Sequence, residues 1–357
     1  MAYTDVNYLR SLGEVDLELK QSSVITEYEA QFLDSINIPA VDYDSTEGLR
    51  AMVAASEALT IMSLGPPSAQ IKQSELTYET RDGAELSALL YQPTHPPSND
   101  SPLVVMFHGG GFCVGSPHGE EHTCRNLVLA FNATCISASY RLAPKFPFPY
   151  GVKDAWDCLR WAAREARSWG ADPLAGFVVG GTSAGGNIAA VLAHMARDEK
   201  LSPPLTGQYL AIPKLLPWDR VPERYREFLL SPAENANAPI LPASAVEAFE
   251  RAFKPDNDDA VWYGVFNHPR SHAGLPATFL QVNGADPLRD EAIIYERVLR
   301  EEMGAKTKMY MYPGLPHGFW IIFGALESSR KFRIEQVEGI GWLLNRAPDY
   351  SGVITRV

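Results

Sequence analysis

The run Leu103–Phe107 constrains the fold most, because every one of its residues is apolar. A strand of this kind is buried on both faces, as in a parallel sheet covered by helices. Further strands are predicted at 75–80, 84–91, 135–140, 177–179, 209–212, 278–282 and 308–312, and helices at 152–168, 184–195, 291–303 and 328–344. This alternation predicts an α/β fold with a mostly parallel sheet and helices on both of its faces.

Two segments fall outside this alternation. Residues 1–65 are predicted to be mostly helical, with apolar residues at helical spacing from Leu49 to Leu59 and a stop at Gly65. Residues 213–262 lie between two sheet strands and contain several prolines and scattered aromatic residues. A connection of this length inside a compact domain is usually functional. We therefore expect the two segments to form a mostly helical cap over residues 66–357, which would form the catalytic domain.

Charge and cysteine content limit the partners and the compartment. The formal net charge of −12 argues against nucleic acid or an anionic membrane surface as a partner. No apolar run approaches the roughly 18 residues that a membrane-spanning helix needs, and the N-terminus lacks the pattern of a secretory signal. The four cysteines, at spacings that match neither a zinc site nor a CxxC pair, are expected to be buried thiols. These observations predict a cytoplasmic protein.

The pentapeptide Gly181-Thr182-Ser183-Ala184-Gly185 has the pattern GxSxG. It follows a predicted buried strand directly and precedes a predicted helix, which is the context of a serine on a sharp, strained turn with an exposed hydroxyl. Side chains at the flanking glycines would clash with the neighbouring strand and helix. The alternative is a structural Gly/Ser-rich turn, but the context favours Ser183 as a nucleophile.

A second glycine-rich segment, His108-Gly109-Gly110-Gly111-Phe112, ends the strand Leu103–Phe107. Glycines there let backbone N–H groups approach a ligand without interference from Cβ atoms. In acyl transfer these groups, together with the N–H of Ala184, would bind the oxyanion of the tetrahedral intermediate. The alternative is a phosphate-binding loop, but the GxGxxG spacing is absent.

A serine nucleophile needs a base and an orienting carboxylate. Asp286 follows the predicted strand 278–282, and His317 follows the strand 308–312. Both therefore lie at the carboxyl edge of the sheet, where open α/β sheets bind ligands. His317 is the only histidine downstream of Asp286, so the chain order Ser, Asp, His selects it. Asp290 is the competing carboxylate, but we expect it at a helix start.

Together these motifs resemble the hormone-sensitive-lipase family of α/β-hydrolases. The resemblance rests on HGGGF at 108–112, YRLAP at 140–144, GTSAGGN at 181–187, DPLRDE at 286–291 and HGF at 317–319. It implies an α/β-hydrolase fold, the triad Ser183, Asp286 and His317, and an oxyanion hole made by Gly110, Gly111 and Ala184. It also implies a cap built from the N-terminal segment and the 213–262 insertion.

These predictions describe a serine carboxylesterase that acts on small to medium esters and needs no metal or organic cofactor. The alternatives are a lactonase, amidase or acyltransferase with the same triad, or a receptor that binds a small molecule without catalysis. The intact His317 argues against the receptor. A homodimer is compatible with the sequence. Five aromatic residues are expected to line an apolar substrate pocket: Phe112, Trp218, Trp262, Phe319 and Trp320.

Overall fold

A single mixed sheet organises the molecule in the computed structural model, which describes residues 5–13, 41–96, 100–255 and 262–355. The sheet order is β1-β2-β4-β3-β5-β6-β7-β8; β2 pairs antiparallel with β1 and β4, and all other pairs are parallel. The strands are β1 (Ile71–Glu79), β2 (Glu85–Pro93), β3 (Leu103–Phe107), β4 (Thr134–Ala138), β5 (Phe177–Thr182), β6 (Gly207–Ala211), β7 (Ala277–Ala285) and β8 (Thr307–Pro316). The predicted α/β-hydrolase architecture is confirmed.

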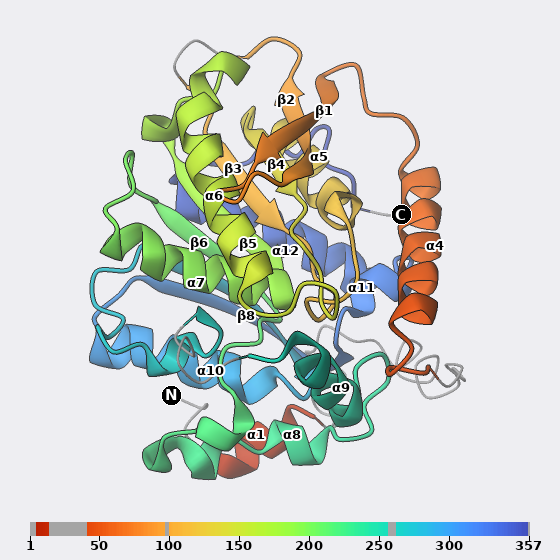
Figure 1. Cartoon of the computed structure of the whole chain (residues 1–357), viewed down its shortest axis with the longest axis vertical. Helices are drawn as coiled ribbons and strands as arrows, with labels where there is room; N and C mark the ends of the chain where they lie inside the picture. The colour runs from red at the N-terminus through yellow and green to blue at the C-terminus, as the bar shows by residue number, and fades with distance from the viewer. Residues whose placement is uncertain (1–4, 14–40, 97–99, 256–261, 356–357) are drawn as a thin grey trace.

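Helices cover both faces of the sheet, as Figure 1 shows. One face carries α5 (Glu121–Phe131) and α12 (Glu327–Leu344), and the other carries α6 (Tyr150–Glu165), α7 (Ala184–Asp198) and α10 (Arg289–Arg297). In β3, Val105 packs into the core on the α7 side, whereas Val104 packs into the core on the α12 side. The central strand is therefore buried on both faces, as its continuous apolar run predicted.

The predicted helix over 291–303 differs from the structure. The α-helix α10 ends at Arg297, and a π-helical turn, η9 (Val298–Glu302), continues the chain. The remaining predicted helices and strands are present with shifted ends. The four cysteines are buried and unpaired by disulfides, as expected.

The two segments that interrupt the alternation contain short helices and one long helix. The N-terminal segment contributes α1 (Val6–Ser11) and α4 (Thr46–Leu64), and the prediction for residues 14–40 lies outside the described residues. α4 begins at the N-cap Ser45 and ends at Gly65, whose φ of 66° a glycine adopts without strain. The insertion contributes η5 (Trp218–Arg220), η6 (Glu223–Phe228), α8 (Ser231–Glu234) and α9 (Ala243–Phe253).

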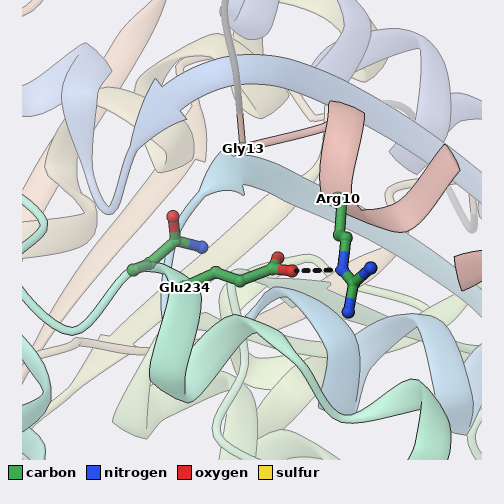
Figure 2. A pocket seen from close by; sticks show the side chains of 4 residues that line it. Arg10, Gly13 and Glu234 are labelled. Atoms are coloured by element: carbon green, nitrogen blue, oxygen red, sulfur yellow. Dashed lines mark ion pairs between the residues drawn. The ribbon is translucent and has the colours of Figure 1, made fainter. Parts of the chain in front are cut away.

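These segments meet at the carboxyl edge of the parallel strands. Arg10 on α1 forms an ion pair with Glu234 at the end of α8 (Nε to Oε1 3.4 Å), and Figure 2 shows the two side chains pointing at each other. Tyr43, just before α4, donates a hydrogen bond to the carbonyl of Ile240 in the insertion at 2.7 Å. The N-terminal segment therefore contacts the insertion at two separate places.

Candidate active site

Ser183 stands on the turn between β5 and α7, half-buried, with φ 57° and ψ −113°. This is a strained conformation for a residue other than glycine, and strain of this kind is typical of a nucleophile turn. Its backbone N–H donates to the carbonyl of Ala211 on the neighbouring strand at 2.8 Å. The close packing depends on Gly185, because a Cβ there would lie 1.9 Å from the carbonyl oxygen of Phe107. The clash expected from the sequence is thus present.

Ser183, His317 and Asp286 lie in a hydrogen-bonded row. Nε2 of His317 is 3.0 Å from Oγ of Ser183, and Nδ1 of His317 is 2.7 Å from Oδ2 of Asp286. His317 follows β8 and Asp286 follows β7, so neighbouring strands deliver the base and its partner to one place. Asp286 is fully buried, and its other oxygen accepts a hydrogen bond from the N–H of Leu288 at 2.8 Å. The imidazole can therefore take the serine proton while the carboxylate holds its orientation.

The competing carboxylate Asp290 is occupied elsewhere. Its Oδ1 lies 2.6 Å from Nε of Arg289, and its Oδ2 accepts hydrogen bonds from the backbone N–H groups of Leu230 and Ser231. These contacts attach the insertion to the start of α10. Asn235 in the insertion donates to the carbonyl oxygen of Asp286 at 3.0 Å, so the loop that carries this carboxylate is held from the cap side as well.

Three residues whose backbone N–H groups are candidate oxyanion donors lie on two loops around Ser183. Gly110, Gly111 and Ala184 all line the cavity that contains Ser183 and His317. Within the described residues, none of these three N–H groups donates a hydrogen bond to another part of the chain. Gly111 has φ 58°, and a Cβ there would lie 2.3 Å from the ring of Phe249. The three unpaired donors match the predicted oxyanion hole in position.

His108 packs against Tyr140 and the glycine loop. Its ring is buried and stacks on Tyr140 with centroids 4.4 Å apart, and Nδ1 lies 2.7 Å from the carbonyl oxygen of Gly109. Burial lowers the pKa of His108 to about 4, so the ring is neutral at neutral pH. Arg141 forms an ion pair with Asp154 at 2.6 Å in the same region.

The cavity at Ser183 has a volume of about 780 Å³ and is mainly apolar. α4 contributes one wall and the insertion contributes another, so residues far apart in the sequence enclose the serine. The apolar lining from these two segments comprises Leu49, Met52, Val53, Ala55, Leu59, Ile240, Leu241, Val246 and Phe249. A pocket of this size suits a small-molecule substrate.

Only two of the five predicted pocket aromatics line this cavity, Phe112 and Trp320. Phe319 lies in the core instead, fully buried against Tyr312 and Phe332. The residues that sequence reasoning missed include Phe249 on α9 and the stripe on α4. The helical spacing from Leu49 to Leu59 was visible, but spacing alone does not distinguish a helix that packs on a core from one that walls a cavity.

The two tryptophans of the insertion also lie outside the cavity lining. Trp218 donates from its indole N–H to Oε1 of Glu291 at 3.2 Å, and the ammonium group of Lys214 lies 4.6 Å from its ring centre. The ring of Trp262 lies beneath the ammonium group of Lys153 at 5.7 Å. Their cation and hydrogen-bond partners hold both indoles against the protein, so the expectation that they line the pocket was wrong.

A buried carboxyl group shares the cavity with Ser183 and was not predicted from the sequence. Glu120, at the end of η2 (Pro117–Glu120), is 2 % exposed and lines the cavity. Burial raises its pKa to about 7, and hydrogen bonds from Thr182 and Thr123 oppose the shift only in part. The position of Glu120 is set by the loop that follows the oxyanion segment, for which no motif gives a signal.

Among the residues that the structure describes, no group of three or more His, Cys, Asp or Glu side chains is arranged to hold a metal ion. In the same part of the chain, no helix combines the length and apolar character needed to cross a bilayer.

Comparison with known proteins places the chain in a family. A family model described as "alpha/beta hydrolase fold" matches residues 104–321. An AB hydrolase superfamily protein of Schizosaccharomyces pombe is 33% identical over 298 residues, which cover 83% of this chain and 87% of that protein. The chain belongs to the α/β-hydrolase family, and the predicted membership of its hormone-sensitive-lipase group is confirmed.

Two further relatives carry functional names. Esterase LipI of Mycobacterium tuberculosis is 35% identical over 274 residues, which cover 74% of this chain and 80% of that protein. The crystal structure of vibralactone cyclase superposes with a TM-score of 0.83 at 31% identity and covers 93% of this chain and 97% of that one. Both similarities extend over most of the two chains compared.

Proposed function

We propose that this protein is a serine carboxylesterase that hydrolyses small to medium esters through an acyl-enzyme on Ser183. The observation that carries the proposal is the row of hydrogen bonds from Asp286 through His317 to Ser183, which opens into a mainly apolar cavity. The similarity to Esterase LipI supports the same reaction class. A geometry of this type activates a hydroxyl that is otherwise a weak nucleophile.

The reaction would proceed in two halves. His317 takes the proton of Ser183 as Oγ attacks the ester carbonyl, and the N–H groups of Gly110, Gly111 and Ala184 stabilise the oxyanion. The C–O bond to the alcohol then breaks, and His317 returns the proton to the leaving oxygen. Water attacks the acyl-enzyme by the same route, which releases the acid and restores the serine.

The N-terminal segment (1–65) and the insertion (213–262) act as a cap in this proposal, and residues 66–357 otherwise form the catalytic domain. Support comes from the cavity lining, to which α4 and α9 both contribute. The cap would exclude bulk water and select the substrate, since an enclosed site strengthens the electrostatic contacts with the oxyanion. Phe112 and Trp320 are the proposed aromatic contacts from the catalytic domain.

A chain-length series tests the proposal. Hydrolysis of para-nitrophenyl acetate, butyrate, octanoate and decanoate is measured for the wild type, and chain-length-dependent turnover well above the uncatalysed rate is expected. Rates that equal the uncatalysed rate for all four esters would refute a general esterase.

A second candidate is transfer of the acyl group to an alcohol, including formation of a lactone from a hydroxy acid derivative. The similarity to vibralactone cyclase favours it, because an alcohol can replace water as the acceptor of the same acyl-enzyme. Product analysis in the presence of an added alcohol distinguishes the two. A new ester as the main product would support transfer, and free acid alone would support hydrolysis.

The buried, unpaired cysteines support a reducing compartment, and we propose a cytoplasmic location for the protein. Fractionation of the native host tests this, and recovery of the protein only from the medium would contradict it. A homodimer is likewise proposed and is tested by light scattering of the purified chain.

A further inference from the structure

One basic side chain in the cavity wall has no acidic partner among the residues that the structure describes. Arg333 on α12 is 3% exposed and lines the same cavity as Ser183. Nη1 donates to the carbonyl oxygens of Gly324 at 2.9 Å and Thr355 at 3.1 Å, and Nη2 donates to that of Trp320 at 2.8 Å. The buried Nε of Arg333 has no hydrogen-bond partner in the described part of the chain.

The other buried arginine and lysine side chains differ from Arg333 in their surroundings. Burying a charge is costly unless a counter-charge or a full set of hydrogen bonds compensates it. Each of the others lies within ion-pairing distance of a buried carboxylate, and the pairs are Arg125 with Glu121, Arg289 with Asp290, and Lys214 with Glu291. Over the described ranges, Arg333 alone among the buried arginines and lysines lacks such a pair.

Arg333 remains a cation under ordinary conditions. Burial lowers its pKa only to about 10, so the guanidinium is charged at neutral pH. Neighbouring His122 adds no second positive charge, because burial and the positive charge of Arg333 lower the pKa of His122 to about 3. The carbonyl contacts use part of its donor capacity and supply no formal negative charge.

The side chains that accompany Arg333 make one end of the cavity polar. Thr123 and Gln336 line the cavity too, and Nε2 of Gln336 lies 3.3 Å from Oγ1 of Thr123. Gln336 is one helical turn from Arg333 on α12, and Thr123 follows His122 on α5. The α4 and α9 walls, by contrast, contribute mainly apolar side chains to the same cavity.

We propose that Arg333 is the anchor of a carboxylate-binding subsite, so that the natural ester bears a free carboxylate in addition to the ester that Ser183 attacks. This inference rests on the proposed esterase function and names its substrate class. A carboxylate would supply the missing counter-charge and accept hydrogen bonds from the unused N–H groups, as carboxylates that pair with guanidinium groups commonly do.

Two series of substrates test the subsite. In the first, para-nitrophenyl half-esters of succinic, glutaric, adipic and suberic acid are each compared with the para-nitrophenyl ester of the monocarboxylic acid of equal chain length. In the second, acetyl esters of ω-hydroxy acids are compared with acetyl esters of the matching alkanols in a pH-stat. At one chain length in one series, kcat/KM for the carboxylated ester is expected to exceed its neutral counterpart by about tenfold or more.

Variants on α12 test whether Arg333 causes the preference for carboxylated esters. Arg333→Met is expected to abolish the preference, Arg333→Lys to restore part of it, and Arg330→Met, which removes an exposed charge paired with Glu327, to leave it unchanged. The readout is the ratio of the two kcat/KM values, so a general loss of stability, which lowers both, does not change it.

The result that overturns the subsite is a wild-type ratio of one or less at every length in both series, or a ratio that Arg333→Met leaves intact. Turnover of the neutral esters reports the proposed function separately, so either can fail alone. If Arg333→Met does not fold, the wild type alone can test the subsite. Inhibition of its neutral-ester hydrolysis by glutarate is then compared with inhibition by glutaramide. Stronger competition by glutarate supports the subsite, and equal competition refutes it.

Discussion

The sheet side and the cap side of the cavity are held in place by different kinds of contact. On the sheet side, Ser183 is held through its backbone N–H, and the buried carboxylate of Asp286 accepts a hydrogen bond from the N–H of Leu288. On the cap side, α4 is mostly exposed, and side-chain bonds attach it to the catalytic domain. Arg50 donates to the carbonyl oxygens of Cys113 and Ala143 at 3.0 and 2.9 Å.

A second bond of the same kind fastens the middle of α4. Glu57 accepts hydrogen bonds from the N–H and the hydroxyl of Ser116 at 3.0 and 2.6 Å. Backbone contacts thus position Ser183 and the Asp286 carboxylate, whereas the α4 wall is attached through the side chains of Arg50 and Glu57. Substitutions on the two sides should therefore separate chemistry from substrate choice.

The largest effect is expected on the sheet side. Ser183→Ala removes the nucleophile and should lower kcat for para-nitrophenyl butyrate by about 10⁴-fold or more, because the remaining residues of such a triad act as a unit. Ser202→Ala, at an exposed position, serves as the matched control and should retain full activity. Retention of a tenth of the wild-type kcat by the first variant would exclude the serine as nucleophile.

The glycine loop should give the next largest effect. Gly111→Ala places a Cβ against the Phe249 ring and strains a residue at φ 58°, which would displace one oxyanion donor. Loss of one such donor typically costs about 10²–10³ in kcat. Gly83→Ala is the control, since Gly83 also has a positive φ, 82°, but has nothing within 4 Å of its Cβ position. Equal kinetics for both variants would argue against the oxyanion assignment.

Glu120 should give a pH-dependent effect on stability. Its folded-state pKa of about 7 lies above the ordinary value of 4.5, so the folded state binds this proton more tightly than the unfolded state. The stabilisation that this proton gives the folded state is complete below pH 4.5 and is lost as the pH rises through 7. The difference in unfolding free energy between Glu120→Gln and the wild type should therefore shift by roughly 3 kcal/mol in favour of the variant as the pH rises from 4.5 to 8.

Urea denaturation at the two pH values measures this difference. Glu85→Gln, at an exposed position of β2, controls for the loss of a carboxyl group. A constant difference between Glu120→Gln and wild type at both pH values would show that the carboxyl titrates as it does in the unfolded chain.

The smallest effect is expected on the cap side. Arg50→Met removes two hydrogen bonds that hold α4 and should raise KM for para-nitrophenyl octanoate roughly 3–10-fold, with kcat for the acetate nearly unchanged. Arg160→Met, at an exposed position of α6, is the control. An equal loss of kcat on both esters would mean that α4 takes part in the chemistry. The contrast between the sheet side and the cap side of the cavity would then be wrong.

The same contrast explains what could be predicted from the sequence. The positions of Ser183, Asp286 and His317 follow from short motifs at strand ends, because each motif places its residue through local backbone geometry. Trp218 and Phe319 were misplaced because an aromatic side chain fits a core as well as a pocket. No sequence motif indicated that Arg333 lines the cavity. Whether a buried charge lacks a partner can be judged only from the folded structure, because its partners come from distant parts of the chain.

The central claim is that Ser183 forms the acyl-enzyme, and covalent labelling tests it most directly. Diethyl para-nitrophenyl phosphate phosphorylates an activated serine and releases para-nitrophenol. Mass spectrometry of the inactivated wild type should find one diethylphosphoryl group per chain, located on Ser183, with the extent of labelling equal to the loss of esterase activity. Labelling of another residue in step with inactivation, or full activity after Ser183 is labelled, would contradict the account.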